Sequence, residues 1–285
     1  MLSRLTPWIV HAKGRELCEI FLSVENSPGG LVEALRVLAK HHVNILHISG
    51  HALPEWERAP VLLFVDVTGR RHVLEELKEE LEAVTGAPVR YQLASVEGLM
   101  MDELTLPLCA LPGVRSIVVG EDDLASMLRG IYERMADVGR AFIFNLAYFG
   151  GRSTAEYLAG RLDLAGEELI RECLKVYQAT GLGRVELVSY NPEEPRAILR
   201  MHDSIECKAF RGQGRPASHY IRGHLSGLLS RLLDEELLAV EVKCVAAGDA
   251  YCEFEVVRAP SSASQGRAGS RDQPAGERRV SRAPR

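Results

Sequence analysis

The spacing of apolar residues between Leu17 and Leu93 changes in a fixed order, and this order restricts the fold more than any other feature of the chain. Alternating apolar residues indicate strands, and apolar residues at three- and four-residue steps indicate amphipathic helices. The expected elements are a strand over 17–24, a helix over 31–42, strands over 43–48 and 61–67, a helix over 72–84 and a strand over 89–93. The order βαββαβ predicts a ferredoxin-like fold, a plan that hosts many unrelated activities.

The loop after the first strand reads Asn26-Ser27-Pro28-Gly29-Gly30-Leu31, and Val43-Asn44-Ile45 opens the second strand. These segments resemble the signature of ACT domains over residues 16–95, although Asn26 and Ser27 stand where an acidic residue is frequent in that family. The resemblance implies an effector, usually an amino acid, often bound between two such domains. The ligand-binding residues it implies are Asn26, Ser27, Pro28, Gly29, Gly30, Leu31, Asn44 and Ile45. A turn needed only for the chain's conformation explains the same sequence equally well.

The second half of the chain mixes helical and strand patterns, which predicts an α+β fold with an antiparallel sheet. The apolar series from Leu124 to Val138 continues to Phe149, which indicates two helices or one kinked helix. Further helices are expected near 169–181 and over 219–233, with strands over 116–119, 185–190, 197–201, 240–245 and 251–257. We expect an N-terminal extension over 1–15, domains over 16–95 and 107–258, a linker over 96–106 and a disordered Arg-, Ser-, Gly- and Pro-rich tail over 259–285.

The last two expected strands join through Gly248-Asp249, so a hairpin brings Cys244 and Cys252 close together. With the segments 204–207 and 218–227, the run 241–254 resembles a 4-vinyl-reductase (4VR) domain of archaeal type. The resemblance implies a sensor module for small hydrophobic or aromatic molecules in transcription regulation, and some members occur near tetrapyrrole reductases. Where a metal is present in that family, the resemblance implies zinc.

Glu241, Cys244 and Cys252 match three of the zinc ligands implied by the resemblance, whereas the fourth position falls at Ser218, a poor zinc ligand. Cys207, or His219 as a substitute, can complete the set. In a regular strand Glu241 and Cys244 point to opposite faces, so joint ligation requires a bulge or a strand end. Alternatively, Cys244 and Cys252 pack as small buried hydrophobes. Four protein ligands would make a closed, structural zinc site.

Composition and charge exclude several classes of protein. The chain has 285 residues, 46% of them apolar, but its apolar runs are shorter than a membrane span requires, and no secretion signal is evident. Six cysteines are too few for a disulfide scaffold and favour a cytoplasmic protein. The net charge is −5, and six arginines in the tail leave the remainder more acidic still. We therefore expect neither a membrane partner nor a broad nucleic-acid-binding face.

No catalytic motif stands out, because the chain lacks a nucleophile elbow, a phosphate-binding loop, a complete dinucleotide fingerprint and a His-Glu-x-x-His helix. We therefore predict a small-molecule-sensing regulatory protein rather than an enzyme. An amino acid would bind the first domain and a hydrophobic or aromatic ligand the second, and ligand binding would change the packing of a homodimer. No helix-turn-helix is evident, so a transcriptional role requires a separate DNA-binding partner. The alternatives are an accessory or reductase-related factor of tetrapyrrole metabolism and a structural dimerisation or tethering protein.

Overall fold

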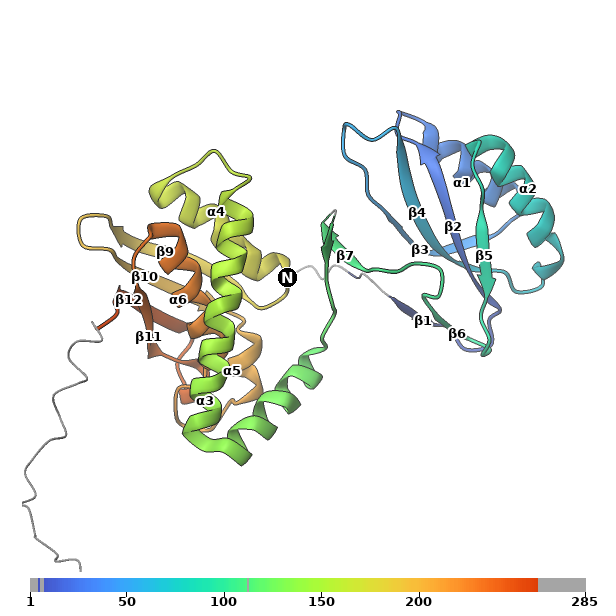
Figure 1. The fold of residues 1–285 in the computed structure, drawn as a ribbon. Helices are drawn as coiled ribbons and strands as arrows, with labels where there is room; N and C mark the ends of the chain where they lie inside the picture. Colours follow the sequence, from blue (N-terminus) through green and yellow to red (C-terminus); the bar gives the residue numbers. More distant parts are fainter. Residues whose placement is uncertain (1–4, 6–7, 112, 261–285) are drawn as a thin grey trace, which may run out of the picture. The chain divides into compact units, whose positions relative to one another are not determined.

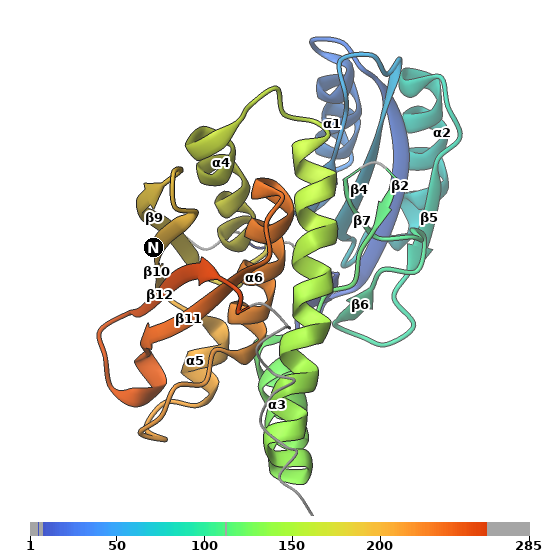
Figure 2. The ribbon, with the colours of Figure 1, turned by 60° about the vertical axis from the view of Figure 1, so that its left-hand side comes forward.

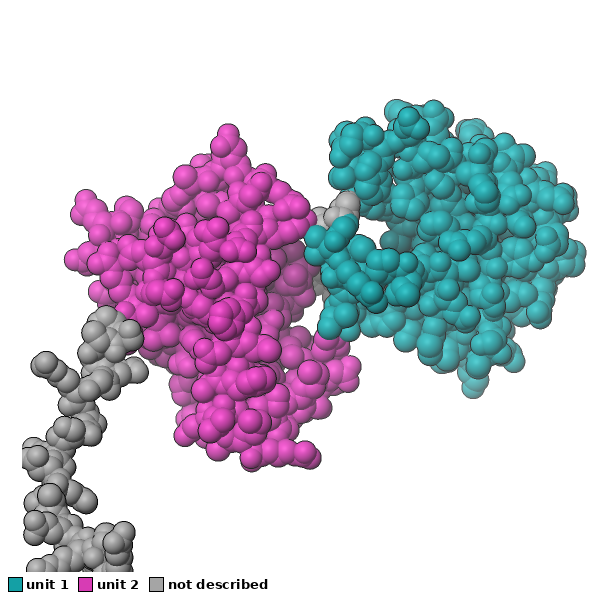
Figure 3. Space-filling model, in the orientation of Figure 1, with its two compact units in different colours: residues 1–118 teal, residues 119–285 magenta. Residues whose placement is uncertain are grey.

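The computed structural model describes residues 5, 8–111 and 113–260 and divides into two compact units, residues 1–118 and 119–285 (Figures 1 and 3). The domain limits expected at residues 95 and 107 stay predictions. Most of the expected disordered tail, from residue 261 onward, lies outside the described residues.

Unit 1 has the predicted ferredoxin-like fold at its centre. Its elements are β1 (Ile9–His11), β2 (Leu17–Glu25), α1 (Gly30–Lys40), β3 (Asn44–Gly50), β4 (Arg58–Asp66), η1 (Arg71–Val73), α2 (Leu74–Thr85), β5 (Arg90–Leu93), β6 (Leu99–Met101), β7 (Cys109–Leu111) and β8 (Val114–Arg115). Four strands form an antiparallel sheet in the order β3-β4-β2-β5, with β2 and β4 at its centre. The predicted order of strands and helices is therefore confirmed.

The alternating residues of the central strands separate the two faces of this sheet. Ile20 and Leu22 of β2 are almost fully buried and face α1 and α2, where they meet Leu38 and Leu77. On the opposite face Leu17, Phe64 and Met100 form a smaller cluster. This second cluster includes the pair β1–β6, which the periodicity of the sequence did not predict.

The segment that follows the sheet differs from the prediction in one respect. The strand expected over 116–119 is wrong, because a short pair, β7 and β8, ends at Arg115. Ile117 and Val118 have the apolar side chains typical of a strand, but both are exposed and belong to no strand among the described residues. Apolar runs this short do not define a strand by themselves.

Unit 2 places helices against one face of a second antiparallel sheet (Figure 1). Its elements are α3 (Glu121–Ala159), α4 (Gly166–Ala179), β9 (Arg184–Asn191), β10 (Arg196–His202), α5 (Ile205–Ala209), α6 (His219–Leu233), β11 (Leu237–Lys243), η2 (Val245–Ala247) and β12 (Cys252–Arg258). The sheet order is β11-β12-β10-β9. Helix α4 packs on β9 and α6 on β11, and α3 packs on α6, which confirms the α+β class.

Helix α3 contains the predicted kink. Ala136 has φ 47° and ψ −126°, which lie outside the helical region, so two helical segments meet there. Gly139 follows the bend, and a Cβ at this position would lie 2.9 Å from the carbonyl oxygen of Ile131. The bend thus needs a residue without a side chain on its inner side.

Helices α3 and α6 pack side by side (Figure 2). Glycines on both helices let the two backbones approach closely. A Cβ on Gly223 or Gly227 would overlap the carbonyl oxygens of Phe144 and Tyr148, and a Cβ on Gly151 would overlap that of His224. Gly223 and Gly227 are four residues apart and therefore lie on one face of α6, and the backbone that approaches this face belongs to α3. Within the described ranges, no helix combines the length and the apolar character needed to cross a bilayer.

Candidate functional site

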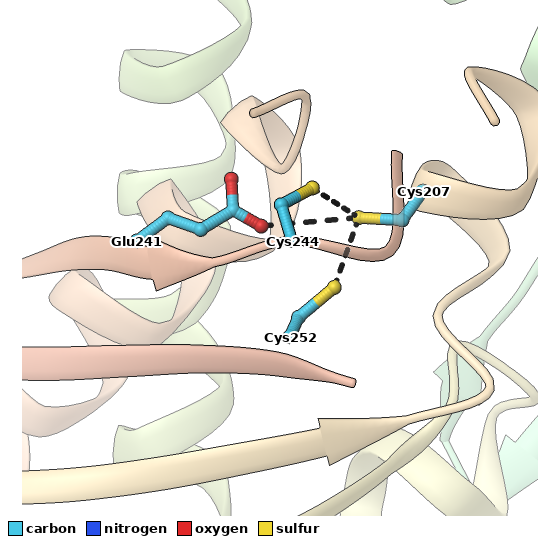
Figure 4. Close-up of side chains that lie close together, drawn as sticks. All are labelled: Cys207, Glu241, Cys244 and Cys252. Carbon is cyan, nitrogen blue, oxygen red and sulfur yellow. Dashed lines mark hydrogen bonds between the residues drawn. The ribbon is translucent and has the colours of Figure 1, made fainter. Parts of the chain in front are cut away.

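Four side chains in unit 2 bring their ligand atoms together, and they come from a helix, two strands and the position that follows the first of these strands (Figure 4). Cys207 lies on α5, Glu241 on β11, Cys244 directly after β11, and Cys252 at the start of β12. The three thiols and one carboxylate oxygen all lie within 4.8 Å of one another. We call Cys207, Glu241, Cys244 and Cys252 the thiolate cluster.

The local backbone explains how Glu241 and Cys244 reach the same point. The pairing of β11 with β12 shifts register between Glu241 and Lys243, and Cys244 lies beyond the last residue of β11. Both conditions for joint ligation, a bulge and a strand end, are therefore present. The turn after Cys244 is held by Asp249, whose Oδ2 accepts a hydrogen bond from the Cys244 N–H at 2.8 Å.

The third thiol comes from a short helix with its own N-cap. Ser204 caps α5, and its hydroxyl accepts a hydrogen bond from the N–H of Cys207. The Cys207 Sγ lies 3.2 Å from the Sγ of Cys252 and 3.5 Å from that of Cys244. It lies 3.9 Å from Oε1 of Glu241. Cys207 is thus the central member of the thiolate cluster.

Burial and mutual hydrogen bonding change the protonation of the thiolate cluster. The three cysteines are fully buried, and burial raises the pKa of the Glu241 carboxyl to about 8. The pKa of Cys244 is lowered, chiefly because the Cys207 thiol, with its Sγ 3.5 Å from that of Cys244, can donate to the thiolate form. A pocket that favours a thiolate already supplies one charged sulfur ligand.

The donor set fits zinc. Three sulfurs and one carboxylate oxygen are ligands that zinc accepts, and thiolates select it over magnesium and calcium. Tetrahedral zinc with Zn–S bonds of about 2.3 Å places its sulfurs about 3.7 Å apart. The observed sulfur separations of 3.2 and 3.5 Å are only slightly shorter.

Ser218 and His219, the other two positions considered from the sequence, lie differently. The Ser218 hydroxyl donates to Oε1 of Glu241 at 2.6 Å, so serine orients the carboxylate rather than completing the ligand set. His219 does not belong to the thiolate cluster and packs edge-on against Tyr132 with 5.3 Å between ring centroids. Burial, with a smaller contribution from Arg222, lowers the His219 pKa to about 4.

Sequence reasoning did not single out Glu206, the neighbour of Cys207. Its carboxylate is buried and accepts hydrogen bonds from the N–H groups of Tyr220 and Ile221, each at 3.0 Å, and from the Tyr132 hydroxyl at 3.1 Å. It therefore ties the first turn of α6 to α5 and α3. An acidic residue between Ser204 and Cys207 carries no periodic signal, so only the fold shows this role.

A second candidate site lies at the predicted effector loop of unit 1. An open pocket of about 790 Å³ is lined by Asn26, Ser27, Pro28, Gly29 and Gly30, and also by Glu25, Glu33, Glu57, Arg58, Val84 and Thr85. Of the other expected residues, Leu31 and Ile45 pack against the core of unit 1, and Asn44 opens β3. The structure thus gathers five of the eight expected residues around one pocket.

The two glycines of this loop are required by its geometry. Gly29 has φ 102°, in the left-handed region that favours glycine, and a Cβ on Gly30 would overlap the carbonyl oxygen of Glu25. Gly29 also occupies the N-cap of α1 and offers no side chain to its first N–H groups. These amides are partial positive charges at the edge of the pocket.

Asn26 has a specific structural task. Its side-chain amide donates to the carbonyl oxygens of Leu53 at 2.9 Å and Trp56 at 2.8 Å. An aspartate has no hydrogen to donate, so the residue that is frequent in ACT domains could not hold this loop in the same way. The departure from the common motif therefore reflects the local loop structure.

Comparison with known domains supports both sequence resemblances. Residues 19–82 match the ACT domain family, and residues 197–258 match the V4R domain family. Two uncharacterized proteins of Methanocaldococcus jannaschii are similar: MJ1642, with 31% identity over 86 residues, and MJ0150, with 29% over 116 residues. These alignments cover 30% and 41% of this chain, but only 51% and 63% of the two relatives.

Three solved structures are similar to parts of this chain. The phenol-responsive sensory domain of the transcription activator PoxR has 17% identity and a TM-score of 0.47, covering 59% of this chain and 84% of that domain. A vinyl-4-reductase family protein from Methanocaldococcus jannaschii has 15% identity and a TM-score of 0.38, with 51% and 85% covered. The regulatory subunit of aspartate kinase from Thermus thermophilus has 20% identity and a TM-score of 0.24, with 29% and 54% covered.

Proposed function

We propose that this chain, which combines an ACT domain with a V4R domain, is a ligand-responsive regulatory protein whose effector binds at the loop of residues 26–30. The observation that carries the proposal is the pocket at this loop, where backbone, acidic groups and one guanidinium converge. Concave sites with a few convergent polar groups are the usual form of small-molecule sites. We assign the protein a regulatory rather than a catalytic role.

The charges of the pocket suit an amino acid. Glu25, Glu33 and Glu57 line it and would attract an ammonium group, whereas the positive end of the α1 dipole would favour a carboxylate. Arg58 is anchored by hydrogen bonds to the carbonyl oxygens of Ser23 at 2.5 Å and Thr85 at 2.7 Å. Its guanidinium therefore lies in a fixed position at the pocket and adds a second contact for an anionic group.

Thermal unfolding with each of the twenty amino acids and a panel of aromatic compounds tests this proposal. Tryptophan fluorescence reports unit 1, because Trp8 and Trp56 both lie there. We expect one amino acid to raise the unfolding temperature of unit 1 through preferential binding to the folded state. Glu57→Gln should reduce the increase, and Glu55→Gln, outside the pocket, should retain it. If no compound shifts either unit, the proposal is wrong.

For the thiolate cluster we propose a structural zinc site. Four protein ligands leave no open position for substrate or water, and a closed site of this kind stabilises a fold rather than catalysing a reaction. Zinc would fix α5 to the β11–β12 hairpin at the place where α6 begins. Because Glu241 and the thiols must lose protons on binding, zinc affinity should fall as the pH is lowered.

Elemental analysis of the purified full chain measures the zinc content directly. We expect one zinc per chain, its loss in Cys244→Ser, and its retention in Cys109→Ser, since Cys109 is an exposed thiol in unit 1. A chelator should lower the unfolding temperature of unit 2 and leave the tryptophan signal of unit 1 unchanged. Equal zinc content in both variants would contradict the assignment.

We also propose that the protein is a homodimer. The second segment of α3 exposes a stripe of large apolar side chains, Val138 (68% exposed), Phe142 (53%), Leu146 (54%) and Phe149 (68%). The stripe repeats at helical spacing along one element, so a two-fold axis can pair it with the same stripe of a second copy. This face is also the feature that favours the alternative function of a dimerisation or tethering protein.

Native mass spectrometry of Phe142→Glu tests the dimer. We expect a dimeric parent chain and a monomeric variant, with Glu133→Gln, an exposed change on the first segment of α3, remaining dimeric. A monomeric parent chain, or a variant that stays dimeric, would refute the use of this stripe. A protein that dimerises but binds none of the tested compounds would support the tethering alternative.

Three further assignments stay predictions. The first is a hydrophobic or aromatic ligand within the V4R domain, which the same compound panel tests by following unit 2. The second is a DNA-binding partner, needed for any transcriptional role because the sequence shows no helix-turn-helix. The third is the cytoplasmic location. The alternative role in tetrapyrrole metabolism gains no support from a particular side chain.

A further inference from the structure

A second group of metal-ligating side chains lies in unit 1, away from the effector loop. His41 is the C-cap of α1, and Glu76 and Glu80 lie one turn apart on α2. One ligand atom from each of these residues lies within 4.8 Å of the others. The two glutamates share a helix face at i,i+4 spacing, and the packing of α1 on α2 brings the imidazole to that face.

Among the residues that the structure describes, none makes an aligned hydrogen bond with the His41 nitrogen that points toward the glutamates. The His41 side chain is only 8% exposed, and this nitrogen, Nε2, is buried. This atom lies 3.3 Å from Oε1 of Glu80 but is not aligned for a hydrogen bond. Buried polar atoms are normally paired, so a buried nitrogen directed at two carboxylates indicates a missing ligand.

Lys40 competes for the same carboxylate. Its ammonium lies 2.6 Å from Oε1 of Glu80, and its side chain is 65% exposed. Exposed ion pairs of this kind contribute little to stability, and the long side chain can move into solvent. The pairing satisfies one oxygen of Glu80, and within the described part of the chain the Nε2 of His41 still has no aligned hydrogen bond.

We propose that His41, Glu76 and Glu80 bind a divalent first-row transition cation. One imidazole and two carboxylates suit zinc, cobalt or nickel and lack the thiolates of the cluster in unit 2. Three protein ligands leave coordination positions for water, so this site is open where the thiolate cluster is closed. The ligand set and the coordination number separate the two sites.

The position of the site gives it a consequence for the effector loop. Helix α1 runs from Gly30 at the loop to Lys40, next to His41, and α2 runs from the glutamates to Val84 and Thr85, which line the loop pocket. A cation bound by His41, Glu76 and Glu80 would therefore fasten together the far ends of the two helices that frame the pocket. The inference does not depend on the identity of the effector.

A cobalt titration of the full chain, loaded beforehand with one zinc per chain, tests the site, because the four-ligand thiolate cluster takes the first zinc and leaves the three-ligand site free. Cobalt held by nitrogen and oxygen gives weak visible bands, whereas cobalt held by thiolates adds intense sulfur-to-metal charge-transfer bands. We expect binding with the weak bands alone. A sulfur-to-metal charge-transfer band would show cobalt bound at the thiolate cluster. The titration therefore reports cobalt binding at the two sites separately.

Matched variants assign the ligands. His41→Gln and Glu80→Gln should each weaken cobalt binding by at least about tenfold, whereas Lys40→Met should strengthen it by removing the competing ammonium. His72→Gln and Glu79→Gln, exposed positions outside the group, should leave the affinity unchanged. Absence of the weak bands, or binding that survives both ligand substitutions, would overturn the proposal.

Discussion

Gly227→Ala should destabilise unit 2, although alanine is the better helix former. A Cβ at residue 227 would overlap the carbonyl oxygen of Tyr148 and lie 2.7 Å from its carbonyl carbon and 3.0 Å from its Cα. Carbon atoms in favourable contact are about 3.5 Å apart or more, so α3 must retreat by roughly 0.8 Å to relieve the carbonyl carbon alone, and by more to relieve the oxygen. The obstacle is backbone, which cannot rotate away as a side chain can.

The size of the effect follows from two opposing contributions. Replacing glycine by alanine within a helix favours folding by about 1 kcal/mol. Overpacking a close contact costs typically about 1–3 kcal/mol and more where backbone must move. Since the contact here is made by three backbone atoms, we expect a net loss of about 2 kcal/mol in the free energy of unfolding of unit 2.

The assay must follow unit 2 separately, and the chain's composition provides the means. Both tryptophans lie in unit 1, so their fluorescence serves as the internal control, while circular dichroism and calorimetry record the second transition. A loss of about 2 kcal/mol should lower the unfolding temperature of unit 2 by roughly 4–8 °C. The tryptophan transition should not move.

Gly130→Ala is the matched control. Gly130 also lies within a helix, but beyond its own turn of helix no atom of the described residues would lie within 4 Å of a Cβ there. We expect stabilisation by up to about 1 kcal/mol, because only the helix preference acts. If Gly227→Ala stabilises unit 2 as Gly130→Ala does, the close helix crossing does not exist as described.

Three further predictions concern single polar groups. Asn26→Asp should cost unit 1 roughly 1–3 kcal/mol, measured by the tryptophan transition, because two carbonyl oxygens lose their donor and face a carboxylate. Glu206→Gln should also destabilise unit 2 by roughly 1–3 kcal/mol, measured by calorimetry. The two carboxylate oxygens of Glu206 accept hydrogen bonds from three donors, whereas a glutamine has one accepting oxygen and an NH2 group that can only donate. Burial lowers the pKa of His224 to about 4. Between about pH 6.5 and 4 this histidine is therefore protonated in the unfolded chain and neutral in the folded chain. The free energy of unfolding should fall as the pH falls through this range. His224→Phe should therefore make the unfolding temperature of unit 2 depend less steeply on pH. A dependence equal to that of the parent chain would contradict the burial argument. Glu206 and Glu241, whose pKa values burial raises, contribute a dependence of opposite sign, but they do so equally in the parent and the variant.

Much of the candidate site could be predicted because its residues carry strong local signals. The Asn26–Leu31 loop joins a strand to a helix, so its position in the fold followed from the change in apolar spacing. The pairing of Cys244 with Cys252 followed from a hairpin of short range. Cys207 could be named as a ligand from its residue type alone. Its contacts with Glu241 and Cys244, which are 34 and 37 residues away in the sequence, depend on how α5 packs against the hairpin.

The misses share a physical cause. The strand pair β1–β6 joins segments about ninety positions apart, and each strand has three residues, so neither shows a measurable period. Glu206, Tyr177 and His224 form buried hydrogen bonds whose partners are distant in sequence, such as the 2.7 Å contact between the Tyr177 hydroxyl and His224 Nδ1. The spacing of apolar residues predicts whether a side chain faces the core or the solvent. It does not predict which distant polar group forms a hydrogen bond with that side chain.

The sequence by itself determined the two domain types, the order of their main elements and the chemical kinds of residue available for binding. These properties depend on local spacing and residue type, which any chain of this sequence carries before it folds. Only the tertiary structure decided that Cys207 rather than His219 joins Glu241, Cys244 and Cys252, and that His41 meets Glu76 and Glu80. These contacts between distant residues depend on how separate helices and strands pack. That packing is set by the total apolar area buried in the core and not by any local segment of the sequence.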